Sequence, residues 1–97
     1  MSVTPRELEE LVAWARAGPR RITVKFKGYR FMVAIGRFVE ALDASGRRVP
    51  WQAAFGSRPP HDVLSSLPIE RITVEERGSA ETFTSIGELL KKAGVRR

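Results

Sequence analysis

The stretch RRITVKFKGYRFMVAIGR, residues 20–37, separates apolar from cationic side chains when it is laid out as a β-hairpin. Successive strand residues point to opposite faces of a sheet, so every second side chain shares a face. One face then collects the large apolar residues Ile22, Val24, Phe26, Phe31, Val33 and Ile35. The other face collects Arg21, Thr23, Lys25, Lys27, Arg30 and Met32. This separation predicts an antiparallel sheet with one apolar and one basic face.

The dipeptide Gly28-Tyr29 predicts the turn of this hairpin, because glycine at the first central position is typical of a type II′ turn. The register that follows pairs Lys27 with Arg30, Phe26 with Phe31, Val24 with Val33 and Ile22 with Ile35. Like charges directly across a ladder are destabilising, and a bound polyanion would relieve that repulsion. We therefore interpret the basic face as a nucleic-acid surface.

The rest of the chain predicts helices before and after these strands. Thr4, Pro5 and Glu7 are typical of a helix start, and an apolar stripe at helical spacing follows up to Gly18-Pro19. Strands are predicted at 37–43 and 69–76 with an edge strand at 47–52, a loop at 53–60, and helices at 61–67 and 85–93. We expect one α+β domain over residues 1–97, a small antiparallel β-sheet of about four strands with helices packed on its apolar face.

Composition bounds the class of protein. The 97 residues carry a net charge of +6 and contain no cysteine, which excludes disulfides, thiol catalysis and thiolate metal sites. No apolar run is long enough for a membrane span, and the polar N-terminus predicts no signal peptide. We expect a cytoplasmic protein with no membrane partner. Arginine-rich charge without cysteine is also compatible with a thermophile.

The usual catalytic groups are sparse. His61 is the only histidine, and no second histidine or cysteine can help it to build a metal site. Ser65 and Ser66 have no base placed beside them, so we interpret them as helix-surface residues. We therefore expect no enzyme activity, no catalytic residues, no bound metal and no cofactor.

A second segment, RRVPWQAAFGSR at 47–58, interleaves basic and aromatic residues. Proteins that bind single strands combine a cationic groove with aromatic side chains on which bases stack. Trp51 and Phe55 could supply such stacking surfaces, or they could pack under a loop as a satellite core. Tyr29 is expected to be exposed in its turn. The sequence leaves the two alternatives for Trp51 and Phe55 open.

The tetrapeptide Arg-Ile-Thr-Val occurs at 21–24 and again at 71–74. Its second copy is followed by Glu75 and Glu76, where the first is followed by Lys25. Four residues of common strand types do not establish a repeat. The later copy is instead interpreted as an acidic neighbour that partly compensates the basic hairpin.

The segments 20–37 and 47–58, together with the flanking helices, give the chain a resemblance in architecture and composition to the ThermoDBP-related single-stranded DNA-binding proteins of thermophilic archaea. The resemblance covers residues 4–93. It implies an antiparallel sheet with packed helices and a cleft with basic edges and an apolar floor. The edges would be Lys25, Lys27, Arg30, Arg47 and Arg48, and the floor Met32, Trp51 and Phe55. The chain lacks the long C-terminal zipper helix of some members, so zipper-driven dimerisation is not implied.

The sequence thus predicts non-catalytic binding of single-stranded nucleic acid, with DNA favoured over RNA. The predicted site comprises Arg21, Thr23, Lys25, Lys27, Tyr29, Arg30, Met32, Arg37, Arg47, Arg48, Trp51 and Phe55. The alternative is a protein-interaction or self-association module that uses the same basic face, and a homodimer is left open. A salt series separates the two, because release of counterions makes polyanion binding steeply salt-dependent.

Overall fold

A computed structural model describes residues 2–96 as ten elements around one antiparallel sheet. In chain order they are α1 (Pro5–Ala17), β1 (Arg20–Phe26), β2 (Met32–Ile35), β3 (Val39–Leu42), β4 (Arg48–Val49), α2 (Trp51–Phe55), α3 (Pro60–Ser66), β5 (Ile69–Glu76), β6 (Ser79–Phe83) and α4 (Ile86–Lys92). The six strands lie in the order β4-β3-β2-β1-β5-β6. The predicted α+β class is confirmed, with two more strands than expected.

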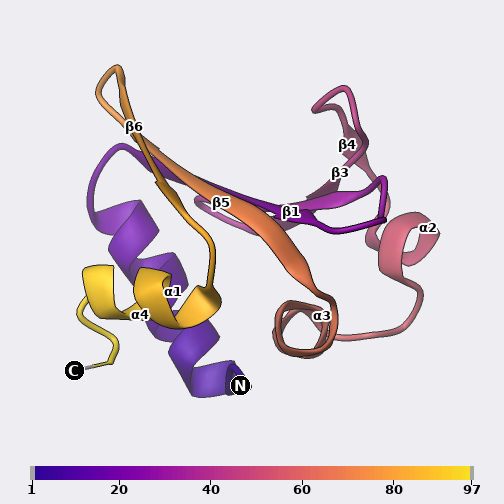
Figure 1. Cartoon of the computed structure of the whole chain (residues 1–97), viewed down its shortest axis with the longest axis horizontal. Helices are drawn as coiled ribbons and strands as arrows, with labels where there is room; N and C mark the ends of the chain where they lie inside the picture. Colours follow the sequence, from indigo (N-terminus) through magenta and orange to yellow (C-terminus); the bar gives the residue numbers. More distant parts are fainter. Residues whose placement is uncertain (1, 97) are drawn as a thin grey trace.

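The helices leave one face of the sheet uncovered. α1, α3 and α4 lie below the sheet, and α2 lies at the end beside β3 (Figure 1). The β3–β4 and β5–β6 hairpins rise on the side away from these helices, so the uncovered side is concave (Figure 1). We call this side the open face.

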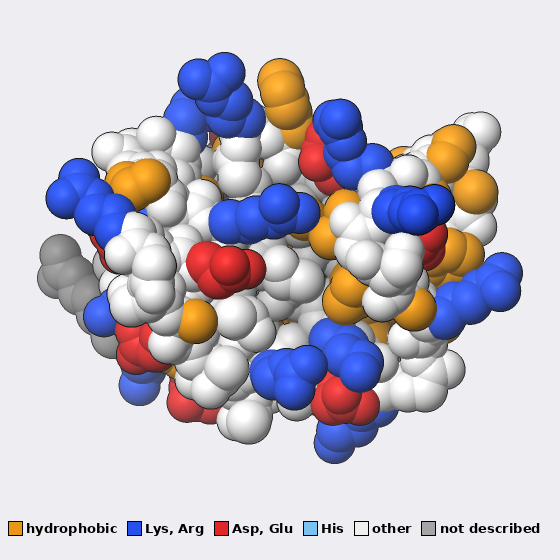
Figure 2. All heavy atoms as spheres, turned by 90° about the horizontal axis from the view of Figure 1, so that it is seen from above, with side chains coloured by type: hydrophobic (Ala, Val, Ile, Leu, Met, Phe, Trp, Pro, Cys, Tyr) orange, Lys and Arg blue, Asp and Glu red, His pale blue; other side chains and the backbone are white. Residues whose placement is uncertain are grey.

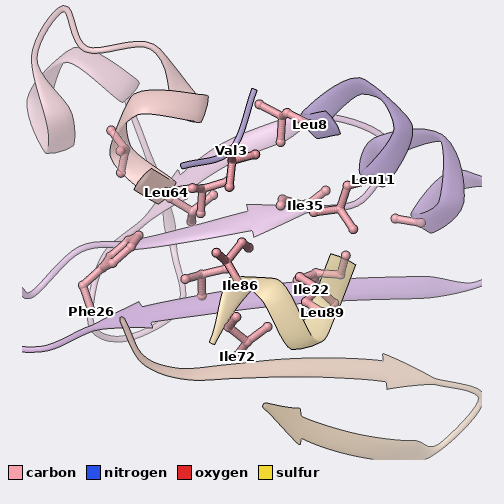
Figure 3. Close-up of a cluster of buried hydrophobic side chains, with 14 of the residues drawn as sticks. Val3, Leu8, Leu11, Ile22, Phe26, Ile35, Leu64, Ile72, Ile86 and Leu89 are labelled. Atoms are coloured by element: carbon pink, nitrogen blue, oxygen red, sulfur yellow. The ribbon is translucent and has the colours of Figure 1, made fainter. Parts of the chain in front are cut away.

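The hydrophobic core fills the space between the sheet and the helices. Ile22, Val24 and Phe26 alternate along β1 and are all buried there. Helix α1 contributes Leu8, Leu11 and Ala15, α3 contributes Val63 and Leu64, and α4 contributes Ile86, Leu89 and Leu90. Side chains from all three helices lie close to those of the strands, with Leu11, Leu64 and Leu89 among the labelled examples (Figure 3). The period-two pattern of the sequence therefore fixes which side of β1 faces solvent.

The predicted register of the hairpin is confirmed in its strands but not at its turn. Ile22 pairs with Ile35 and Val24 with Val33, as predicted. The described pairing ends at Lys25 and Met32, however, and residues 27–31 form a loop instead of a two-residue turn. Phe31 lies in that loop and is half-buried. The predicted pairs of Lys27 with Arg30 and of Phe26 with Phe31 are therefore wrong.

Tertiary contacts explain this longer loop. The Lys27 N–H donates a hydrogen bond of 2.8 Å to the Pro68 carbonyl, and Phe26 pairs with Ile69 across a bulge. The Tyr29 hydroxyl donates to the Ala54 carbonyl. The chain after β1 is thus drawn towards β5 and α2, away from its own return strand.

Two elements were not predicted. Residues 47–52 form only the two-residue strand β4, and Pro50 precedes helix α2, which occupies part of the predicted loop. Strand β6 pairs along the whole of Ser79–Phe83 with β5. A tight turn at Arg77-Gly78 joins β5 and β6, with φ of 48° and 82°. Two consecutive positive φ angles match the type I′ turns that favour hairpins.

An ion pair joins the two ends of the chain. The Arg96 guanidinium donates to both carboxylate oxygens of Glu7, at 2.6 and 2.9 Å, and also to the Ser2 carbonyl at 2.7 Å. These hydrogen bonds, together with one from the Thr4 N–H, lower the pKa of Glu7 from 4.5 to about 2. The ion pair between Glu7 and Arg96 therefore links helix α1 to the C-terminal segment.

This pair makes part of the stability pH-dependent. The folded-state pKa of Glu7 lies below its unfolded value, so the stabilisation is complete above about pH 4.5 and is lost as pH falls towards 2. We expect Arg96→Gln to lower the free energy of unfolding by about 1–2 kcal/mol at pH 7, after discounting for partial exposure. Urea unfolding at several pH values should show this difference shrinking below pH 4.5. A difference that stays constant down to pH 2 would contradict the assignment.

Candidate nucleic-acid interface

A row of small side chains crosses the middle of the open face. Strand register places in this row Thr82, Thr73, Thr23 and Ala34, from β6 to β2, and the row ends on β3 at the longer Glu40. Short side chains leave a sheet surface low, and long side chains on either side raise it. We call this row across the strands the groove, and its small side chains the groove floor.

The rows on each side of this floor carry longer side chains, apart from Ala80 on β6. On one side the register aligns Arg71, Lys25, Met32, Leu42 and Arg48. On the other it aligns Ala80, Glu75 and Arg21. Met32 is half-buried and Leu42 is buried, although both point away from the main core. Seen from above, the face shows basic side chains over its surface and margin with some acidic ones among them (Figure 2).

The acidic neighbour predicted for the basic hairpin is present. Strands β1 and β5 pair so that the two Arg-Ile-Thr-Val segments lie antiparallel, with Thr23 opposite Thr73 and Arg21 opposite Glu75. Lys25 Nζ lies 3.3 Å from a carboxylate oxygen of Glu70. Across the sheet, Arg48 lies 3.2 Å from Glu40. Part of the positive charge of this face is therefore already compensated within the fold.

Five predicted phosphate contacts form no salt bridge among the described residues: Arg21, Lys27, Arg30, Arg37 and Arg47. Within residues 2–96, none of them has an acidic partner within 4.0 Å. Lys27 and Arg30 lie in the β1–β2 loop, and Arg47 lies in the β3–β4 turn at the same end of the strands. Arg37 lies in the β2–β3 turn at the opposite end, near Arg21. The unpaired cations therefore stand at both ends of the strands that carry the groove.

The β3–β4 turn has a defined shape that positions Arg47 and Arg48. The Asp43 carboxylate accepts hydrogen bonds from the N–H and hydroxyl of Ser45, at 2.9 and 2.6 Å, and from the Arg47 N–H at 3.0 Å. These bonds lower the pKa of Asp43. Because Asp43 stays ionised and bonded, the turn presents its two arginines from a fixed backbone.

A hollow of about 500 Å³ opens where the groove meets the β2–β3 turn. Its lining includes Ala34 from the groove floor, Arg21, Arg37 and Phe38, with Glu40, Gly46 and Arg48 towards the β3–β4 hairpin. This volume lies within the ~300–1,000 Å³ range of small-ligand sites. Sequence reasoning missed Phe38, because it falls inside the strand predicted at 37–43, whereas β3 begins only at Val39. A large aromatic residue next to a Gly-Arg turn was the available signal.

The predicted aromatic residues do not lie on the open face. Phe55 is only 5% exposed, and its ring packs against those of Phe26, Tyr29 and Trp51. Trp51 is half-buried, and its indole N–H donates 2.7 Å to the Arg58 carbonyl. The sequence left open whether Phe55 is a stacking surface or part of a satellite core, and its burial places it in the satellite core. Tyr29 stacks on Phe55 with ring centroids 5.6 Å apart, so one side of its ring is covered.

Ser65, one of the residues examined as a possible catalytic group, makes hydrogen bonds that hold the fold together. The Ser65 hydroxyl accepts 2.7 Å from the Val3 N–H and donates 2.6 Å to the His61 carbonyl, which ties the N-terminus to α3. Among residues 2–96, no three His, Asp or Glu side chains form a group that could hold a metal ion. None of the described helices is long and apolar enough to cross a membrane.

Comparison of the chain with protein-family models, curated proteins and solved structures gives no match in any of the three. Arguments about function therefore depend on the open face itself.

Proposed function

We propose that the open face binds single-stranded nucleic acid without catalysis, with DNA favoured over RNA. The observation that carries the proposal is the groove of small side chains across the strands, with five unpaired cations placed at both strand ends. A strand of nucleic acid would run along this groove with its phosphates beside those cations. The resemblance to the ThermoDBP-related family leads to the same proposal.

The size of the groove suits a short single strand. The row from β6 to β3 crosses five strands, which at a spacing of about 4.8 Å give a path of roughly 19 Å. That length accommodates several nucleotides, comparable to the lower end of the ~4–16 nucleotides covered by one single-strand-binding fold. The concave form of the open face, with a raised hairpin at each side, supports a strand that lies in it rather than over it (Figure 1).

Apolar groups on the same face favour single strands over duplexes. Met32 is half-buried beside the groove, and Phe38 stands exposed at its end. The faces of bases are available for apolar contact only when the bases are unstacked, as in a single strand. A duplex would meet the cations but would leave these apolar groups unused.

The salt dependence of binding tests this proposal. With five phosphate contacts and a slope of about −0.7 per contact, we expect log affinity for single-stranded DNA to fall with log salt concentration with a slope of about −3.5. Fluorescence anisotropy would measure this slope for single-stranded DNA, single-stranded RNA and duplex DNA, with light scattering to record self-association. Binding that is weak and independent of salt, or concentration-dependent dimers without nucleic-acid binding, would favour the protein-interaction alternative instead.

A further inference from the structure

Phe38 is an aromatic residue whose exposure the fold does not explain. Its side chain is 68% exposed, the most of any large apolar residue in the described part of the chain. Burial of a phenylalanine side chain normally stabilises a fold, and here that stabilisation is largely unused. The other exposed aromatic, Tyr29 at 37%, has its ring against Phe55 and its hydroxyl bonded to Ala54.

The backbone around Phe38 is held from both sides. The Gly36 N–H donates 3.1 Å to the Phe38 carbonyl, which closes the turn between β2 and β3. The Arg16 side chain from α1 donates 2.7 Å to the Arg37 carbonyl. These two hydrogen bonds therefore hold in place the turn that carries the Phe38 ring. Because a pre-ordered platform loses little conformational freedom on binding, such bracing favours a ligand contact.

Arginines surround this ring. Phe38 lines two hollows. The first, of about 500 Å³, includes Arg21, Arg37 and Arg48, and the second, of about 660 Å³, includes Arg16, Arg20 and Arg37. Arg48 is paired with Glu40, and Arg20 lies over the Trp14 ring and close to Glu76. The side-chain charges of Arg21 and Arg37 have no such partner within residues 2–96.

We propose that Phe38 is the stacking platform for one nucleobase of the bound strand, with the adjoining phosphates held by Arg21 and Arg37. This inference rests on the proposed function and assigns to Phe38 the stacking role that the sequence suggested for Trp51 and Phe55. Base–aromatic stacking needs an accessible ring face next to cations for the backbone, and Phe38 has both.

Glu40 determines on which side of the hollow the phosphates lie and on which side the base lies. Glu40 lines the same cavity and pairs with Arg48, so this side of the hollow carries little net charge and the phosphates lie on the Arg21 and Arg37 side. The uncharged base then occupies the Glu40 side, where an N–H group of the base can donate to the carboxylate.

The arginines also argue against Phe38 as a contact between two copies of the chain. A symmetric interface centred on Phe38 would bring the same arginines of both copies together. Like charges brought into one interface are repulsive and cost affinity. A polyanion has the opposite charge, so the charges around Phe38 fit a nucleic acid and not a second copy.

The test compares Phe38→Ala with two matched variants, Phe38→Leu and Phe38→Trp. The probes are a labelled oligodeoxythymidylate and inorganic polyphosphate, which is a polyanion without bases. We expect Phe38→Ala to weaken oligonucleotide binding roughly 5- to 100-fold and to leave polyphosphate binding unchanged. Phe38→Leu should resemble Phe38→Ala, because leucine is apolar but cannot stack, and Phe38→Trp should bind at least as tightly as the wild type.

Thermal unfolding serves as the folding control, and the exposure of Phe38 predicts wild-type stability for all three variants. Wild-type oligonucleotide affinity in folded Phe38→Ala would overturn this inference and leave the proposed function standing. An equal loss of polyphosphate binding would also overturn it, since stacking requires a base. If the wild type itself does not bind the oligonucleotide, both the inference and the proposed function fail.

Discussion

Phe26→Ala is expected to lower the free energy of unfolding by about 3–5 kcal/mol, the usual cost of deleting a buried aromatic side chain. Phe26 ends strand β1, is completely buried, and meets the edge of the Phe55 ring at a centroid distance of 6.1 Å. Its removal would leave a cavity where the main core joins the aromatic cluster of α2. Urea unfolding monitored by circular dichroism would measure the loss.

Phe31→Ala is the matched control for this prediction. Phe31 is half-buried in the β1–β2 loop and contacts Tyr29 and Phe55 by ring edges. We expect a smaller cost of about 1–2 kcal/mol, because part of its surface already meets water. Equal large losses for both substitutions would indicate that the two-residue turn predicted from the sequence forms after all, with Phe26 and Phe31 paired in the core.

The strand pairing of the basic hairpin could be predicted because it depends on a local pattern. A strand side chain has only two directions, so the alternation of Ile22, Val24 and Phe26 determines which face is buried. A shift of one residue would expose all of them, and this fixes the register against Val33 and Ile35. Helix α1 was predictable for a similar reason, because Thr4 and Glu7 cap each other as the sequence suggests.

The β1–β2 loop and strand β6 could not be predicted from local pattern. The loop depends on partners distant in sequence, Pro68 for Lys27 and Ala54 for Tyr29. Strand β6 is an exposed edge strand that buries little, so it needs no apolar alternation. Only its turn at Arg77-Gly78 marked it in the sequence.

The residues of the candidate site also divide into those that local pattern predicts and those that depend on distant partners. Arg21 follows from alternation along β1, but Lys27, Arg30, Arg37 and Arg47 lie in loops and turns whose positions depend on the fold. The groove floor also requires knowledge of which strands are neighbours. Thr73 and Thr82 join Thr23 only because β5 and β6 extend the sheet beyond β1. Likewise, whether Trp51, Phe55 or Phe38 is exposed depends on the packing of short irregular segments, which composition does not determine.

The triple variant Arg21→Gln, Lys27→Gln, Arg37→Gln is expected to weaken binding to single-stranded DNA about 100-fold at low salt. It should also make the slope of log affinity against log salt concentration shallower by about 2, because three phosphate contacts at about 0.7 each are lost. None of the three side chains has an ion-pair partner within residues 2–96. All three are exposed, so the fold should tolerate their replacement.

A second triple variant separates the place of the charges from their number. Arg6→Gln, Lys91→Gln, Lys92→Gln removes the same total charge from α1 and α4, which lie on the other side of the sheet (Figure 1). Lys92 is paired only with the exposed Glu81 at 3.5 Å, so this variant should also remain folded. Screening confines charge effects to about 10 Å at 0.1 M salt, and we expect its affinity to stay within about threefold of the wild type. Equal losses in the two variants would mean that net charge alone attracts the nucleic acid, and the open face would no longer be its binding site.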